Sequence, residues 1–100
     1  MRRTNRFSKA EAQRIHARDR FRRRKNINLT DELHREAVTR IRNEDPSAHF
    51  VEKRSNRISI WRLMISGADC LVVYDGKRRN IVTVLPERWN ADYVQRWWEN

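Results

Sequence analysis

The sequence predicts an α+β fold in which two N-terminal helices pack on a four-stranded antiparallel β-sheet, followed by a short C-terminal helix. Two stretches within residues 8–45 place apolar side chains at helical spacing behind helix-capping signals. From residue 48 onward, short β-branched and apolar runs are separated by turn residues, a pattern typical of an antiparallel meander. A length of 100 residues allows one modest hydrophobic core.

The first helix is expected to begin after Ser8, because Ser8 and Glu11 match a capping box in which each side chain accepts a hydrogen bond from the other residue's amide. We expect it to end between residues 25 and 28. Its buried stripe is narrow, so one flank packs on the body of the protein and the basic flank stays in solvent. The stripe consists of Ile15, Ala17 and Phe21, with Ala10 and Ala12 in the first turns.

The second helix is expected to begin after Thr30, an N-cap residue followed by two carboxylates that the helix dipole favours. Pro46 ends it, because the residue before a proline is disfavoured in the helical conformation. We interpret His34, in the first turn, as structural or solvent-facing rather than catalytic. The apolar positions of this helix are Leu33, Ala37, Val38 and Ile41.

Four strands are expected at residues 49–54, 57–65, 70–74 and 80–85. Turns centred on Gly67 and on residues 76–77 would pair Arg62 with Val72, Tyr74 with Arg79 and Cys70 with Thr83. One face of the sheet would have mixed side chains and would stay open to solvent. Arg62 and Thr83 would lie near the middle of this mixed face, and Tyr74 would lie about 13 Å from Thr83 along the strand direction. The face covered by the helices would carry Trp61, Leu63, Ile65, Leu71, Val73, Val82 and Val84.

The charge balance predicts an anionic partner, with nucleic acid as the first expectation. Lys and Arg outnumber Asp and Glu by 23 to 13, for a formal net charge of +10. The basic run at residues 18–25 has one large apolar side chain, Phe21, which disfavours a membrane surface as the partner. With no apolar leader or spanning segment, we expect a cytoplasmic protein. Cys70 is the single cysteine and the three histidines have no metal-site spacing, so no metal or cofactor is expected.

The domain organisation is expected to have three parts. Residues 1–6 read as a flexible basic arm, residues 7–86 as one α+β domain, and residues 87–100 as a Trp-rich tail helix. Trp89, Trp97 and Trp98 are too large an apolar surface to leave in water, so the tail is expected to dock on the body or on a partner. The alternative is that these indoles stack on unpaired bases.

One helical stripe suits phosphodiester chemistry. His16, Arg20 and Arg24 are spaced four residues apart, so in a helix they face the same way with a rise of about 6 Å per step. Guanidinium groups hold phosphate in a bidentate fork, and imidazole transfers protons near neutral pH. The alternative is a solvated basic face with His16 as an ordinary polar residue.

Several segments together resemble a family of small bacterial and phage proteins. They are the His-Ala-x-x-Arg-x-x-x-Arg motif from His16 to Arg24, Leu-Thr-x-x-Leu from Leu29 to Leu33, and the hairpin segments Leu71 to Asp75 and Ile81 to Pro86. This arrangement resembles the RelE/barnase/EndoU/colicin-like (BECR) ribonuclease fold over roughly residues 14–86. The resemblance implies an α+β fold and metal-independent RNA cleavage through a 2′,3′-cyclic phosphate.

The resemblance also implies roles for individual residues. His16 would be the general base or acid, and Arg20 and Arg24 would hold the phosphate and its developing charge. Thr83, with Arg62, would complete the site from the sheet. A second proton-transfer group would have to be Thr83, Tyr74 or an arginine-assisted water. The residues expected to contact RNA are Arg23, Arg24, Lys25, Arg62 and Tyr74.

Two functions follow from these expectations. The first is a small endoribonuclease of toxin or phage host-takeover type. The second is a basic binding protein without catalysis, which attaches to nucleic acid or to an acidic host protein. RNA is the expected partner of the enzyme, and an antitoxin or host protein could bind through the Trp-rich tail. Nothing in the residues points specifically to a gyrase-directed toxin on the same fold.

Overall fold

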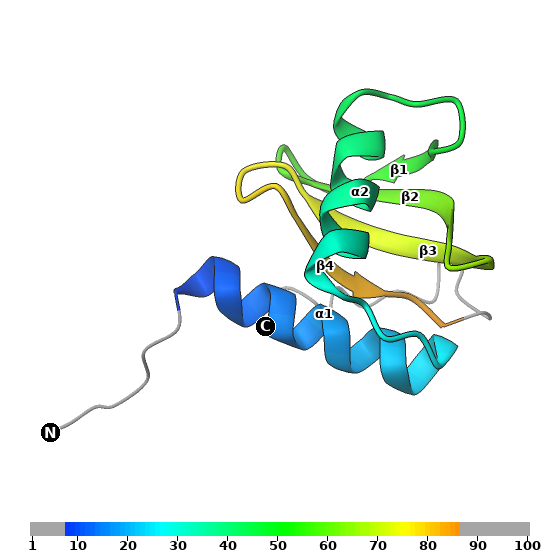
Figure 1. Cartoon of the computed structure of the whole chain (residues 1–100). Coiled ribbons are helices and arrows are strands. Elements are labelled where there is room, and N and C mark those ends of the chain that lie inside the picture. Colours follow the sequence, from blue (N-terminus) through cyan, green and yellow to red (C-terminus); the bar gives the residue numbers. More distant parts are fainter. Residues whose placement is uncertain (1–7, 87–100) are drawn as a thin grey trace, which may run out of the picture.

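The computed structural model describes residues 8–86 (Figure 1). The expected basic arm at residues 1–6 and the expected tail helix with Trp89, Trp97 and Trp98 lie outside the described residues. Within them, no helix is both long and apolar enough to cross a membrane. The elements, in chain order, are α1 (Lys9–Lys25), α2 (Asp31–Arg42), β1 (His49–Lys53), β2 (Ile58–Ile65), β3 (Ala68–Asp75) and β4 (Asn80–Val84).

The prediction of two helices and a four-stranded antiparallel sheet is confirmed. Local signals explain the helix boundaries. The Ser8 hydroxyl accepts from the Glu11 amide, and the Glu11 carboxylate accepts from the Ser8 amide, so the capping box is complete. Asn26 ends α1 in the left-handed conformation, with φ 56°. The Thr30 hydroxyl accepts from the amide of Leu33 at the start of α2.

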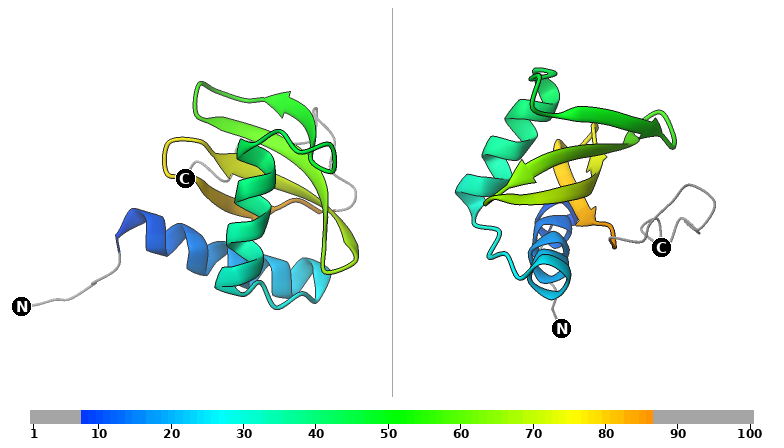
Figure 2. Two further views of the ribbon diagram at one scale, coloured as in Figure 1. Left: turned by 45° about the horizontal axis from the view of Figure 1, so that its top comes forward. Right: turned by 90° about the vertical axis from the view of Figure 1, so that its right-hand side faces the viewer.

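Both helices pack on one face of the sheet, whose strand order is β1-β2-β3-β4 (Figure 2). α1 runs along the edge strand β4, and Ala17 and Phe21 are its fully buried residues. Ile15, expected in the buried stripe, is 46% exposed. The strand residues that pack against the helices are Leu63, Ile65, Cys70, Val72, Tyr74, Ile81 and Val84.

The predicted register between β2 and β3 is wrong by one residue. Arg62 lies opposite Leu71, whereas the prediction placed it opposite Val72. The cause is the turn, in which Ser66 and Gly67 both have positive φ, 50° and 78°. This is the requirement of a two-residue type I′ turn. Because side chains alternate between faces, the shift exchanges the face assignment of β2 relative to β3.

The predicted register between β3 and β4 is also wrong. Thr83 lies opposite Val73, whereas the prediction placed it opposite Cys70. The turn accounts for two residues of the change, because Tyr74 pairs with Ile81 and not with Arg79 as predicted. A bulge at Val82 adds one more, since the next pair skips one residue of β4.

The second face of the sheet is divided into an exposed and a buried part, whereas the prediction left the whole face open. Arg62, Met64 and Asp69 are exposed on it, and the rest is apolar and buried. Ile60 and Val73 have no exposed surface, and Thr83, which pairs with Val73, is fully buried as well. Leu71, expected beneath the helices, packs against this second cluster. The cluster is formed by Ile58, Ile60, Val73, Val82 and Leu85.

Candidate nucleic-acid interface

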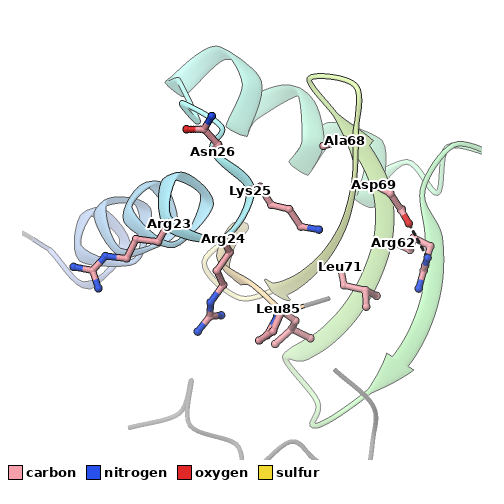
Figure 3. A pocket seen from close by; sticks show the side chains of 10 residues that line it. Arg23, Arg24, Lys25, Asn26, Arg62, Ala68, Asp69, Leu71 and Leu85 are labelled. Carbon is pink, nitrogen blue, oxygen red and sulfur yellow. Dashed lines mark hydrogen bonds and ion pairs between the residues drawn. The ribbon is translucent and has the colours of Figure 1, made fainter. Parts of the chain in front are cut away.

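A pocket of about 640 Å³ lies between the C-terminal end of α1 and strands β2 and β3 (Figure 3). We call it the cationic pocket. Lys25 extends from the end of α1 toward β3, and Arg62 stands with Asp69 on the opposite wall (Figure 3). The lining residues are Arg23, Arg24, Lys25, Asn26, Arg62, Ala68, Asp69, Leu71, Leu85 and Pro86.

The charges that line the cationic pocket are mostly positive. Asp69 is its one acidic residue among the described residues, and its carboxylate lies 2.8 Å from a guanidinium nitrogen of Arg62. Both side chains of this pair are about half exposed, 51% and 56%, so solvent screening makes the pair weak. An anion that entered the pocket could therefore bind Arg62 in place of Asp69 with little loss of free energy.

The basic side chains in the last turn of α1 also stabilise the fold. Cationic side chains in a last helical turn interact favourably with the helix dipole, and Arg23 and Arg24 occupy that turn. Arg23 reaches back to Asp19 at 3.3 Å, and a guanidinium nitrogen of Arg24 donates to the carbonyl oxygen of Val84 at 2.6 Å. The Arg24 hydrogen bond ties α1 to β4, which fixes one wall of the cationic pocket relative to the sheet.

The stripe of His16, Arg20 and Arg24 forms on α1, but its arginines contact protein groups. Arg20 pairs with its neighbour Asp19 at 2.7 Å, and Arg24 donates to Val84 as described above. His16 is half-buried. Neither His16 nor Arg20 is among the residues that line the cationic pocket.

The environment of His16 keeps its imidazole neutral. Burial lowers the pKa of His16 below its ordinary value, and the positive charge of Arg20 lowers it further. A neutral imidazole at neutral pH can accept a proton, which is the requirement for a general base.

Thr83 and Tyr74 lie in packed interior rather than beside an open surface. Thr83 has no exposed surface, and its hydroxyl contacts the carbonyl oxygen of Val84 at 3.4 Å. Tyr74 is 7% exposed and belongs to the cluster beneath the helices. Both placements follow from the register and the bulge, which sequence reasoning did not anticipate. The cationic pocket does bring together Arg23, Arg24, Lys25 and Arg62, the other four residues expected to contact RNA.

A second pocket, of about 280 Å³, lies between α1, α2 and the β3–β4 turn. Sequence reasoning missed it. One feature of the sequence could have indicated it. Arg35 and Arg42 are seven residues apart and therefore share one face of α2. Its lining residues are Arg14, Asp31, His34, Arg35, Val38, Thr39, Arg42, Arg79 and Asn80.

No family model, curated protein or solved structure matches the chain in comparisons with each. The resemblance to the BECR ribonuclease fold therefore stays a prediction. Between Ser8 and Pro86, no group of three or more His, Cys, Asp and Glu side chains is arranged to hold a metal ion.

Proposed function

We propose that the protein binds RNA through the cationic pocket. The observation that supports this most directly is the convergence of basic side chains from two distant parts of the chain, Lys25 with its neighbours on α1 and Arg62 on β2. Phosphate contacts by Lys and Arg supply most of the sequence-independent affinity for nucleic acid. Ala68, Leu71 and Pro86 add partly exposed apolar surface against which a base or ribose could rest.

RNA is proposed over DNA because of the resemblance to ribonucleases in the α1 motif and the closing hairpin. The protein's excess of positive charge would attract either polymer. Comparing an RNA oligonucleotide with DNA of the same sequence separates the two, since the ribose 2′-hydroxyl is the group that distinguishes them.

A double variant, Lys25→Gln with Arg62→Gln, is expected to weaken binding of a labelled single-stranded RNA by about tenfold, because it removes two phosphate contacts. Fluorescence anisotropy at low salt measures this. Arg22→Gln is the matched control, since Arg22 is an exposed arginine of α1 outside both pockets. The double variant removes two charges and the control removes one. A control loss about half that of the double variant on a logarithmic scale would therefore show that overall charge, and not the cationic pocket, determines binding.

The second candidate function is metal-independent RNA cleavage with His16 as general base. The observation that favours it is the half-buried His16 beside Arg20, with a lowered pKa that keeps the imidazole neutral. In this proposal His16 would take the proton of the ribose 2′-hydroxyl, whose oxygen attacks the adjacent phosphorus while the bond from phosphorus to the 5′-oxygen breaks. The leaving 5′-oxygen would take its proton from an arginine-assisted water, and Arg20 would stabilise the charge that develops on the phosphate. The buried Thr83 would have no direct role.

Incubation of the full chain with end-labelled RNA in EDTA tests this second function. The expected products are 2′,3′-cyclic phosphate ends, formed by the unaltered protein and lost in His16→Ala while RNA affinity is retained. RNA that stays intact, although the protein is folded and binds it, would leave binding as the function and reject the catalytic role of His16.

A further inference from the structure

The second pocket gathers four arginines from three elements. Arg14 comes from α1, Arg35 and Arg42 come from α2, and Arg79 comes from the β3–β4 turn. The one acidic residue among its lining residues is Asp31, which pairs with Arg18 at 3.2 Å. The protein thus places four positive charges around one small concave space.

These four arginines have no counter-charge of their own. Within residues 8–86, none of their side chains makes a hydrogen bond or ion pair. In the cationic pocket, by contrast, Arg62 pairs with Asp69. All four arginines are exposed, so their guanidinium groups can reach a ligand from solvent. Like charges held together in this way repel each other, and an anion between them would relieve that repulsion.

The backbone at Arg79 strengthens the argument. Arg79 has φ 56°, in the left-handed region that an arginine adopts only at a free-energy cost. Glycine would occupy this position without that cost. Strained backbone of this kind is concentrated at functional sites, and here it holds a guanidinium at the edge of the pocket.

Two other polar residues that line the second pocket, Asn80 and His34, already make hydrogen bonds within the protein. The side-chain nitrogen of Asn80 donates to the carbonyl oxygen of Ala10 and to the side chain of Gln13. The His34 Nε2 accepts from the Ile81 amide. These contacts occupy Asn80 and His34, so the arginines and the exposed Thr39 are the polar groups that can meet a ligand.

We propose that the second pocket binds a terminal phosphate or pyrophosphate group, either free or at the 5′ end of an RNA strand. An internal phosphodiester carries one negative charge, whereas a terminal phosphate or a pyrophosphate carries more and better matches four guanidinium groups. The site is separate from the cationic pocket. Arg14 and Arg24 are ten residues apart on α1, which corresponds to about 15 Å along the helix. The proposal does not depend on RNA binding in the cationic pocket.

Isothermal titration calorimetry of the full chain with inorganic pyrophosphate tests the proposal. Arg79→Gly and Arg14→Gln are each expected to raise the Kd about tenfold, because each removes a charge-assisted hydrogen bond. Arg79→Gly is the sharper of the two, since glycine suits the left-handed backbone and the variant is expected to melt at the same temperature or higher. The exposed Arg22→Gln and the double variant Lys25→Gln with Arg62→Gln are expected to keep the original Kd.

The outcomes separate this site from the cationic pocket. Loss of pyrophosphate binding in the Lys25 and Arg62 variant alone would assign the anion to the cationic pocket and overturn the proposal. So would a complete absence of binding, or equal losses in Arg22→Gln and Arg79→Gly. Comparing the affinities of RNA oligonucleotides with a 5′-phosphate and with a 5′-hydroxyl identifies the source of the phosphate. Weaker binding of the 5′-phosphate form by Arg79→Gly identifies an RNA end, and an unchanged preference identifies a free phosphate ligand.

Discussion

Asp75→Asn is expected to lower the free energy of unfolding by about 3 kcal/mol, since removal of the charge from a buried ionic network leaves its partners uncompensated. Asp75 ends β3 and has no exposed surface. Its carboxylate lies 2.5 Å from Arg57 and 3.3 Å from Arg78, and it accepts from the Gln13 side chain at 3.0 Å. The same carboxylate accepts from the backbone amides of Lys77 and Arg78, which shapes the β3–β4 turn.

The network around Asp75 also predicts that the free energy of unfolding decreases in acid. Burial opposes ionisation, but the hydrogen bonds from Arg57 and Gln13 prevail and lower the pKa of Asp75 from 3.8 to about 2. Because the pKa is lower in the folded protein, the stabilisation is fully present above pH 3.8 and is lost as the pH falls through about 2.

Urea denaturation of the protein and of Asp75→Asn between pH 7 and pH 2 measures both effects. The matched control is Asp69→Asn, because Asp69 also lies on β3 but belongs to an exposed pair with Arg62 and should contribute less than about 1 kcal/mol. If the two asparagine variants were equally stable, the buried network would not hold α1 and the turn in the way described here.

His34→Ala is expected to lower the free energy of unfolding by about 2 kcal/mol, because a buried backbone amide would lose its acceptor. His34 is 7% exposed, and its Nε2 accepts from the Ile81 amide at 3.1 Å. This contact joins α2 to β4 next to the bulge. Glu36→Ala is the control, since Glu36 is an exposed residue of the same helix and its replacement should change stability by less than about 0.5 kcal/mol.

The His34 contact also predicts a dependence on pH near neutrality. Burial lowers the pKa of His34 below 6.5, and the charge of Arg14 lowers it further. The stabilisation is therefore present above pH 6.5 and is lost as the pH falls through the folded-state pKa. His16 has a pKa lowered in the same direction, so His34→Ala should reduce this dependence and a variant with both histidines replaced should remove it. An unchanged pH profile in His34→Ala would contradict the assignment of Nε2 as an acceptor.

These contacts explain how the fold presents basic side chains. α1 is anchored in the core by Phe21, at its first half by Gln13 and at its last turn by Arg24. A helix held at three points presents its remaining cationic side chains in fixed positions, so less side-chain and backbone ordering is needed when an anion binds.

The helices could be predicted from sequence because their signals are local. Ser8 with Glu11, and Thr30, satisfy backbone groups within a few residues of themselves. The strand register could not be predicted in the same way. It depended on Ser66 adopting a left-handed conformation, on a four-residue turn between Asp75 and Asn80, and on an extra residue at Val82. None of these positions carries a residue that demands the observed geometry.

The candidate site shows the same division. Arg23, Arg24 and Lys25 were found because they are adjacent on one helix. Arg62 was found because it is the one charged side chain in an otherwise mostly apolar strand. A register that the structure corrects placed Thr83 beside Arg62, with Tyr74 on the same face farther along its strand. The second pocket was missed because it depends on how α1 and α2 are placed on the sheet, which brings Arg14, Arg35 and Arg42 to the same pocket.

The salt dependence of RNA affinity tests the central proposal most directly. For single strands, the logarithm of affinity falls with the logarithm of salt concentration by about 0.7 per phosphate contact. The double variant Lys25→Gln with Arg62→Gln is therefore expected to have a slope shallower than that of the unaltered protein by about 1.4. A slope identical to that of the unaltered protein would mean that these two side chains touch no phosphate, and the cationic pocket would not be the RNA-binding site.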